Sequence, residues 1–193
     1  ERKPKDRKKF KADIRRAEQE LAARMAGFVD GDGRFVTDAE EDDSGDMRDT
    51  PANARLLAVE LRREDPDIVI MPWGEDTNPG HVALFNLFRR AATELALQRG
   101  RPLLAMYNRD PKTTEIEEQL AVPFDGEAAR WKAELLRCHD SQQQRNLSSR
   151  GYGMDERILR MNRRIQQELS ARRLEGWKEE SPYAESFHLE LFG

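Results

Sequence analysis

Two short apolar runs constrain the fold of this chain more than any other feature. They are Asp67–Met71 and Pro102–Tyr107, and each has the length of a β-strand with hardly any polar residue after its first position. Such runs are typical of parallel strands that are covered on both faces. Between them, residues 80–100 carry apolar side chains at helical spacing. The order strand, helix, strand predicts an α/β sheet with a right-handed crossover, and we expect residues 68–71 to form a central strand flanked by helices.

Helices are predicted on both sides of this unit. Apolar stripes at helical spacing cover residues 10–26, 51–64, 126–145 and 154–169. Thr50-Pro51 is typical of a helix N-cap followed by proline at the first helical position. Residues 34–36 are expected to form a short strand, and residues 113–124 an edge strand. A coiled coil is disfavoured because the heptads do not persist from one segment to the next.

Composition limits the classes of protein to which the chain can belong. Its 193 residues suit a single domain, residues 1–193, with a hydrophobic core. With 33 Lys and Arg against 37 Asp and Glu, the net charge of −4 gives no electrostatic reason to bind nucleic acid. The single cysteine, Cys138, excludes an internal disulfide and an all-cysteine metal site. No apolar run approaches the roughly 20 residues of a membrane-spanning helix.

An acidic stretch, residues 37–50, lies between the first two helices. It contains Asp38-Ala39-Glu40-Glu41-Asp42-Asp43 and is almost free of apolar side chains. Metal binding is one interpretation of such a run. A solvated surface loop is the favoured interpretation, because the ligand spacing of an EF-hand is absent.

His81 is the strongest candidate for chemistry. It follows the first apolar run and lies in the first turn of the next helix, on the face that carries Leu84 and Phe85. Ligands bind at the carboxyl ends of strands in open α/β sheets, so a cleft lined by Trp73, Asp76, Asn78 and His81 is expected there. We take His81 as a metal ligand, Asp76 and Asn78 as catalytic candidates, and Trp73 as a substrate contact. A histidine that merely packs in the first turn is an equally good interpretation of its position alone.

The other nucleophilic or ligating side chains have weaker support. His139 is half turned toward the core of its helix, which favours a hydrogen-bonded structural histidine. His188 has no supporting context near it in the sequence. Cys138 adjoins His139, but neighbours on a helix point in different directions, so an inert buried thiol is favoured over a nucleophile.

Four stretches in the same order carry a resemblance to a known family. Pro66–His81 resembles the second motif of the LmbE-like, or PIG-L, zinc-dependent N-deacetylases, in which a strand leads to a loop ending in His-Pro-Asp-His. Lys132–Gln142 is similar to the family's K-x-x-x-L-x-x-H-x-S-Q helix, and Tyr183–Phe187 to its Y-A-E-x-F signature. Lys11–Gly27 is similar to its R-x-x-E helix. The similarity covers nearly the whole chain.

The resemblance implies a fold, a reaction and a metal. The fold would be Rossmann-like with a mostly parallel sheet, and the reaction the removal of an N-acetyl group from an amino sugar or related small amide. Zinc would be held by His81 together with His and Asp of an upstream His-Pro-Asp-Asp-Glu motif. The chain begins with Glu1 and lacks that motif, so we expect its first βαβ portion to be missing. We also expect a cytoplasmic protein that binds a small N-acylated molecule, can form a homo-oligomer and binds no nucleic acid.

Two departures from the family motif leave alternatives open. Asn78-Pro79-Gly80-His81 replaces His-Pro-Asp-His, so an amide stands where the family has an imidazole that stabilises the oxyanion. A zinc-dependent deacetylase is the leading hypothesis, and a non-catalytic relative that binds a sugar-like ligand is the second. A helical interaction module is the third, and it fails if the two apolar runs prove to be adjacent parallel strands. With one ligand present, we expect the chain alone to bind zinc weakly and to be inactive.

Overall fold

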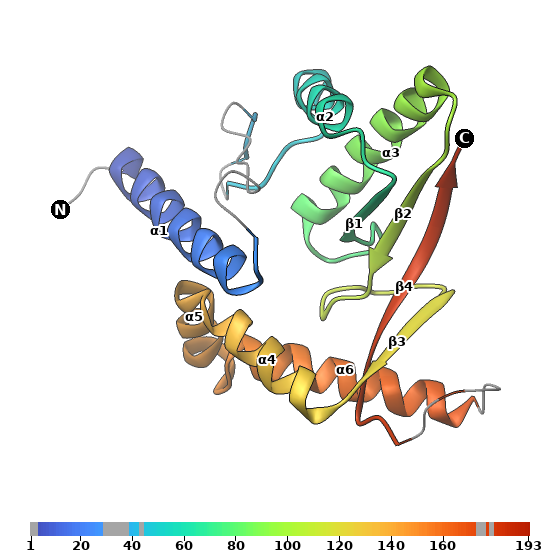
Figure 1. The fold of residues 1–193 in the computed structure, drawn as a ribbon. Helices are drawn as coiled ribbons and strands as arrows, with labels where there is room; N and C mark the ends of the chain where they lie inside the picture. Colours follow the sequence, from blue (N-terminus) through green and yellow to red (C-terminus); the bar gives the residue numbers. More distant parts are fainter. Residues whose placement is uncertain (1–3, 29–38, 43–44, 173–176, 178–179) are drawn as a thin grey trace. The chain divides into compact units, whose positions relative to one another are not determined.

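The computed structural model describes residues 4–28, 39–42, 45–172, 177 and 180–193 (Figure 1). Contacts divide the chain into two compact units, each built from two segments. Unit 1 comprises residues 1–35 and 123–184, and unit 2 comprises residues 36–122 and 185–193. The strand expected at residues 34–36 lies outside the described residues. No described helix is long and apolar enough to span a membrane.

Unit 2 contains the strand–helix–strand element that the apolar runs predict. Helix α2 (Pro51–Glu64) is followed by β1 (Ile68–Pro72), α3 (Pro79–Arg99) and β2 (Leu103–Asn108). Strands β1 and β2 pair in parallel, with Ile68 opposite Leu104. The two apolar runs are therefore adjacent parallel strands, and the hypothesis of a purely helical interaction module is wrong.

The α/β class is confirmed, but the expected mostly parallel sheet is wrong. The order of the four described strands is β1-β2-β4-β3, with β3 at Leu120–Phe124 and β4 at Tyr183–Phe192. Strand β4 pairs antiparallel with β2, and the described sheet is mostly antiparallel. The sequence interpretation missed β4 because it treated the last third of the chain as mostly helical, although residues 187–191 alternate between apolar and polar side chains.

The prediction that residues 68–71 form a central strand is also wrong, because β1 is an end strand of the described sheet. Its side chains alternate between two environments. Met71 is buried, whereas Ile68 is 56% and Ile70 is 63% exposed. Helices α2 and α3 cover the Met71 face (Figure 1). A continuous apolar run predicts burial on both faces, and here only one face is covered by described residues of unit 2.

The core of unit 2 lies between α2, α3 and that face of the sheet. It contains Leu61 of α2, Phe88 and Leu95 of α3, and Leu103 and Tyr107 of β2, together with smaller side chains. Small residues of α3 such as Ala92 let the helix approach the sheet closely. Helix α2 begins and helix α3 ends at the residues that the sequence predicts. Thr50 caps α2 by accepting from the Asn53 amide, and α3 ends at Gly100, whose φ of 63° is in the left-handed region.

A buried asparagine anchors the described part of the predicted acidic loop to α2. The side chain of Asn53 is fully buried, accepts a hydrogen bond from the Glu40 amide (2.8 Å) and donates to the Glu40 and Arg48 carbonyls (2.8 and 2.7 Å). Glu41 and Met47 form an isolated antiparallel bridge. The loop is therefore a hydrogen-bonded turn where it is described, and residues 37–38 and 43–44 lie outside that description.

Unit 1 is helical. It contains α1 (Pro4–Met25), α4 (Gly126–Arg137), α5 (Asp140–Arg150) and α6 (Met154–Ala171). The helix expected over residues 126–145 is in fact two helices, broken at Cys138-His139. Glu18 of α1 explains the break, because its carboxylate accepts from both the amide and the hydroxyl of Ser141 (2.6 and 2.8 Å). Glu18 thereby satisfies donors at the start of α5 that a continuous helix would have paired internally.

Candidate functional site

The candidate site forms where two loops meet at one end of the parallel pair. The loop after β1 and the loop after β2 leave the sheet at the same edge, because parallel strands place their carboxyl ends together. The loops then pair with each other. The Thr77 amide donates to the Lys112 carbonyl (3.1 Å), the Thr114 amide donates to the Glu75 carbonyl (2.8 Å), and Asp76 bridges Thr113. This short ladder fixes residues 75–77 against residues 110–114.

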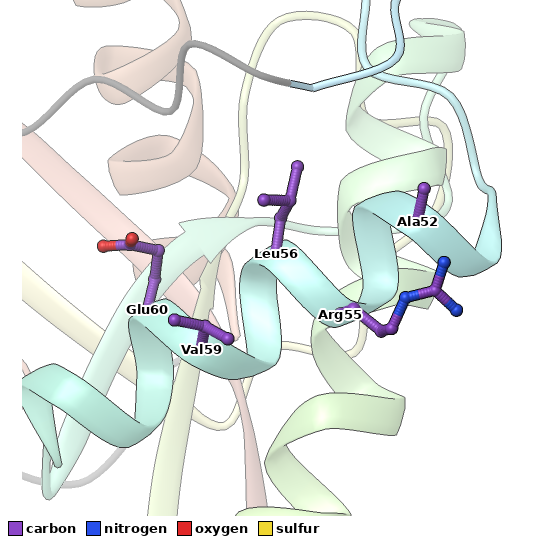
Figure 2. A pocket seen from close by; sticks show the side chains of 5 residues that line it. All are labelled: Ala52, Arg55, Leu56, Val59 and Glu60. Atoms are coloured by element: carbon purple, nitrogen blue, oxygen red, sulfur yellow. The ribbon is translucent and has the colours of Figure 1, made fainter.

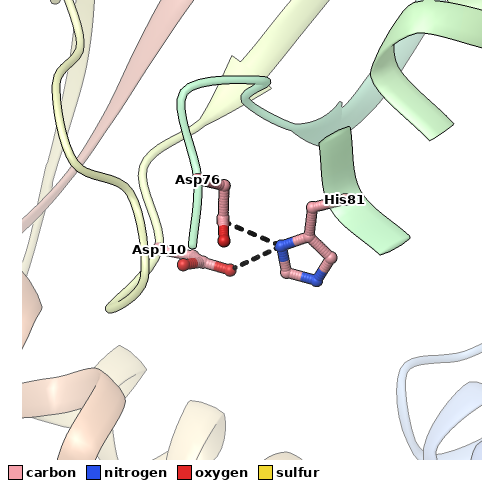
Figure 3. Close-up of side chains that lie close together, drawn as sticks. All are labelled: Asp76, His81 and Asp110. Carbon is pink, nitrogen blue, oxygen red and sulfur yellow. Dashed lines mark hydrogen bonds and ion pairs between the residues drawn. The ribbon is translucent and has the colours of Figure 1, made fainter. Parts of the chain in front are cut away.

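Two aspartates converge on one ring nitrogen of His81 (Figure 3). Asp76 Oδ2 lies 2.8 Å and Asp110 Oδ2 lies 3.3 Å from His81 Nδ1. The other oxygen of each carboxylate is held by its own loop. Asp76 Oδ1 accepts a hydrogen bond from the backbone N–H of Asn78 (2.5 Å), and Asp110 Oδ1 accepts one from the backbone N–H of Lys112 (2.5 Å). Both carboxylates are therefore oriented toward His81 by backbone contacts.

The donor set suits a divalent metal ion. One ligand atom from each of Asp76, His81 and Asp110 lies within 4.8 Å of the others, and this is the one such group of three found among the described residues. Imidazole nitrogen and carboxylate oxygen are both zinc ligands. The Asp76 side chain is wholly buried, while those of His81 and Asp110 are 27% and 18% exposed, so the cluster remains accessible from solvent.

Sequence reasoning named Asp76 and His81 but missed Asp110. The structure brings all three together because the two loops pair, and no spacing in the sequence announces that pairing. Position alone offered one signal, since Asp110 follows the second apolar run as Asp76 follows the first. Carboxylates after both parallel strands meet at one edge of the sheet.

Asn78 caps helix α3. Its side-chain oxygen accepts from the Gly80 amide (3.3 Å), and Pro79 occupies the first helical position. The oxygen is thus turned toward the helix, which leaves the amide nitrogen as the group that can donate to a ligand.

Gly80, the second departure from the family motif, has a steric explanation. A Cβ atom built on Gly80 would lie 2.9 Å from the Cβ of Asp46 and 3.0 Å from its carboxylate. The aspartate that the family has at this position would collide with Asp46. In this chain the carboxylate of Asp46, from the acidic stretch, therefore lies beside position 80, where the family motif has an aspartate.

Trp73 lies in an aromatic cluster next to the loop rather than among the three candidate ligands. Its ring centroid is 5.0 Å from Phe85, 5.3 Å from Tyr107 and 4.5 Å from His188. Its indole nitrogen is buried and has no hydrogen-bond partner among the described residues. His188, for which the sequence offered no context, reaches this cluster because β4 pairs with β2, placing His188 opposite Tyr107.

Tyr107 packs against Trp73 and Phe85 in the aromatic cluster. Its side chain is fully buried, and its hydroxyl donates to Glu190 Oε2 (2.7 Å), which Arg89 also contacts. Burial, followed by the hydrogen bond to Glu190, raises the pKa of Tyr107 well above its ordinary value. The hydroxyl therefore remains protonated and acts as a structural donor.

Neither the cavity along α2 nor the histidine at position 139 contributes a member to the group formed by Asp76, His81 and Asp110. A cavity of about 320 Å³ lies along α2, lined by Ala52, Arg55, Leu56, Val59 and Glu60 (Figure 2), and includes none of the predicted site residues. His139 is the N-cap residue of α5 in unit 1, where its carbonyl accepts from the amides of Gln142 and Gln143.

Comparison with solved structures identifies the fold of the chain. No family model matches the chain, and no curated protein matches it. Among solved structures, N,N'-diacetylchitobiose deacetylase from Pyrococcus horikoshii is 17% identical with a TM-score of 0.62, over 93% of this chain and 64% of that one. The chain has an LmbE-like fold. The resemblance stated from the sequence is thus confirmed for the fold, and deacetylases of teicoplanin biosynthesis share it at 15% identity.

Two other solved structures with the LmbE-like fold broaden the comparison. A conserved protein of Thermus thermophilus is 25% identical with a TM-score of 0.59, over 91% of this chain and 72% of that one. GalB, a 4-carboxy-2-hydroxymuconate hydratase from Pseudomonas putida, is 20% identical with a TM-score of 0.63, over 92% of this chain and 71% of that one. The chain thus spans 64% to 72% of the length of the chitobiose deacetylase and these two proteins. The printed activities of the neighbours differ, so the fold hosts more than one reaction.

Proposed function

We propose that the protein is a zinc-dependent hydrolase that removes an N-acetyl or similar acyl group from an amino sugar or a related amide. The observation that carries the proposal is the convergence of Asp76 and Asp110 on His81, at the end of parallel strands in an LmbE-like fold. The proposal concerns the full-length protein, because the family resemblance implies a His-Pro-Asp-Asp-Glu motif that these 193 residues do not contain.

In this proposal His81 holds the zinc ion and Asp76 fixes the orientation of the imidazole ring. A bound zinc ion supplies Lewis acidity, which activates water and polarises the amide carbonyl. The Asp76 carboxylate, wholly buried and 2.8 Å from Nδ1, prevents the ring of His81 from rotating away. An oriented ligand matters because a loosely held ring would cost the site both metal affinity and geometry.

Asn78 and Trp73 would act on the substrate. The side-chain oxygen of Asn78 caps α3, so its side-chain nitrogen remains available as a donor. This nitrogen would donate a hydrogen bond to the substrate's carbonyl oxygen as negative charge develops on that oxygen. Trp73, next to Phe85 in the aromatic cluster, would offer apolar surface to the substrate's ring. Both roles use groups at the same edge of the sheet as His81.

Metal analysis and a deacetylation assay on the full-length protein test this proposal. We expect His81→Ala to lose bound zinc and activity on N,N'-diacetylchitobiose. Asn78→Ala should keep zinc and lose about 100- to 1,000-fold in turnover, the usual effect of removing one oxyanion donor. Asn86→Ala, which replaces an exposed asparagine of α3, is the matched control and should change neither. Full zinc content in His81→Ala, or full turnover in Asn78→Ala, would contradict the corresponding role.

One observation favours a second candidate, a non-catalytic relative that binds a sugar-like ligand. Asn78 cannot carry a proton as the family's imidazole does, and Gly80 lacks the family's carboxylate. The variant Asn78→His separates the two candidates. If the protein is an enzyme, the imidazole should raise its activity or shift its pH optimum. If parent and variant bind a sugar equally and neither hydrolyses it, the second candidate is supported.

A further inference from the structure

We propose that His188 binds a hydroxyl group of the substrate's sugar ring through its Nε2 atom, beside the ring of Trp73. The inference rests on the proposed function in taking an amino sugar as the substrate. It gives a role in substrate recognition to a residue of β4 for which the sequence offered no context.

His188 lies at the same edge of the sheet as the candidate site. It is opposite Tyr107, the second-last residue of β2. Its ring centroid is 4.5 Å from that of Trp73, which directly follows β1. Trp73 in turn packs against Phe85, which lies one turn after His81 on the same face of α3. The aromatic cluster therefore connects His188 to the face of α3 that carries His81.

A hydrogen bond to the backbone determines which nitrogen of His188 carries the hydrogen. Nδ1 lies 3.0 Å from the carbonyl oxygen of Glu117. A carbonyl oxygen only accepts, so Nδ1 is the donor, and in the neutral ring Nε2 then has a lone pair. Among the described residues no donor contacts Nε2. His188 therefore presents an acceptor whose direction is set by the contact to Glu117.

The segment that carries Glu117 is itself fixed to β4 on both sides of His188. The backbone N–H of Gln119 donates to the Phe187 carbonyl (2.9 Å), and the Gln119 side-chain oxygen accepts from the backbone N–H of Leu189 (2.7 Å). The imidazole ring is thus held at Nδ1 and packed against Trp73. A side chain that is already held loses little conformational entropy when a ligand binds to it.

An aromatic ring beside a hydrogen-bond acceptor suits a sugar. A sugar ring has C–H groups on its faces and hydroxyl donors around its edge, so one face can lie on Trp73 while a hydroxyl donates to His188 Nε2. Trp73 and His188 are both half-buried, so part of each remains exposed. The indole nitrogen of Trp73 is buried, and the hydrogen bond to the ligand therefore falls to His188.

Two substitutions separate recognition of a hydroxyl from packing alone. In His188→Asn the side-chain nitrogen takes the place of Nδ1, so the contact to Glu117 is kept and Nε2 is lost. In His188→Gln the longer side chain brings an amide oxygen to the place of Nε2, and the contact to Glu117 is lost. A ring that only packs should tolerate asparagine at least as well as glutamine. Recognition of a hydroxyl requires the reverse order.

Steady-state kinetics of the full-length protein with N,N'-diacetylchitobiose test the proposal. We expect His188→Asn to raise KM about 10-fold, since one hydrogen bond is lost, and to keep kcat within about twofold, since the bond is made equally in the bound substrate and the transition state. His188→Gln should keep KM within about threefold of the parent. An unchanged KM in His188→Asn, an equal loss in both variants, or a loss in kcat instead of KM would overturn the proposal. Urea unfolding checks that both variants fold.

Nuclear magnetic resonance of the His188 ring gives a readout that needs neither turnover nor a substitution at position 188. It uses the full-length His81→Ala variant, which is expected to leave the sugar intact. Long-range ¹H–¹⁵N spectra should place the proton of the neutral ring on Nδ1, and N,N'-diacetylchitobiose should shift the Nε2 signal more than the Nδ1 signal. A proton on Nε2 in the free protein, or a ring that saturating sugar leaves unchanged, would contradict the assignment.

The two proposals fail in different ways. If His188→Asn binds and hydrolyses the sugar like the parent while His81 is required for deacetylation, the role of His188 is wrong and the proposed function stands. If the sugar binds through His188 and the full-length protein hydrolyses no amide, the role of His188 stands and the proposed function is wrong.

Discussion

Asn53 offers the sharpest test of how unit 2 is held together. Replacing it with alanine removes three hydrogen bonds from a fully buried position, one accepted from the Glu40 amide and two donated to the Glu40 and Arg48 carbonyls. At about 1 kcal/mol for each, the loss is about 3 kcal/mol. Alanine favours the helix by about half a kcal/mol, which leaves a net destabilisation of about 2.5 kcal/mol.

The variant Asn53→Asp separates lost hydrogen bonds from lost volume. Aspartate has nearly the same shape and keeps the oxygen that accepts from the Glu40 amide. It replaces the two donors by an oxygen that faces the Glu40 and Arg48 carbonyls. We therefore expect Asn53→Asp to be at least as destabilised as Asn53→Ala at pH 7, because an acceptor would face two acceptors in a buried site.

Urea unfolding followed by circular dichroism measures these differences, with Asn86→Ala as the matched control. Asn86 is an exposed asparagine of α3, so its replacement should stabilise the protein slightly through helix propensity. Hydrogen exchange over residues 39–64 should show faster exchange in the Asn53 variants because that segment loses its anchor. If the free energies of unfolding of Asn53→Ala and Asn86→Ala agree within 1 kcal/mol, the argument about buried hydrogen bonds is wrong.

Two more predictions concern single contacts. Gly80→Ala should destabilise the protein by about 1 to 3 kcal/mol because its Cβ would collide with Asp46, and the double variant Gly80→Ala/Asp46→Gly should recover most of the loss in a thermal unfolding experiment. Burial alone would raise the pKa of Asp155, but hydrogen bonds from Gln143 and Arg137 hold it below its usual 3.8. The stability this adds is present above about pH 4 and lost as pH falls through the lowered pKa, so the melting temperature of Asp155→Asn should fall less than that of the parent between pH 5 and pH 2.

The helices and strands that could be predicted from the sequence are those marked by a pattern of a few consecutive residues. The apolar runs gave β1 and β2, and Thr50-Pro51 gave the start of α2, because strand-length apolar stretches and N-caps are properties of a few consecutive residues. The single helix expected over residues 126–145 was wrong because the interaction that ends it comes from Glu18, far away in the chain. No local pattern near His139 reports that contact.

The same distinction applies to the candidate site. His81 and Asp76 were found because they follow β1 within one loop. Asp110 was missed because its proximity depends on the pairing of two separate loops, and His188 because its place depends on the insertion of β4 beside β2. Long-range pairing decides both positions, and a single sequence contains no direct measure of it.

The strand order has a consequence for how the protein is made. Strand β4 lies between β2 and β3, although residues 183–192 are synthesised after both. On the ribosome, β2 and β3 therefore emerge before the strand that lies between them in the sheet. The edge of β2 stays unpaired while about seventy-five further residues are translated, which takes several seconds at usual elongation rates. An exposed edge of this kind can pair with other chains. Chaperone engagement during translation should accordingly persist until β4 has left the exit tunnel, which ribosome profiling of chaperone-bound nascent chains would detect.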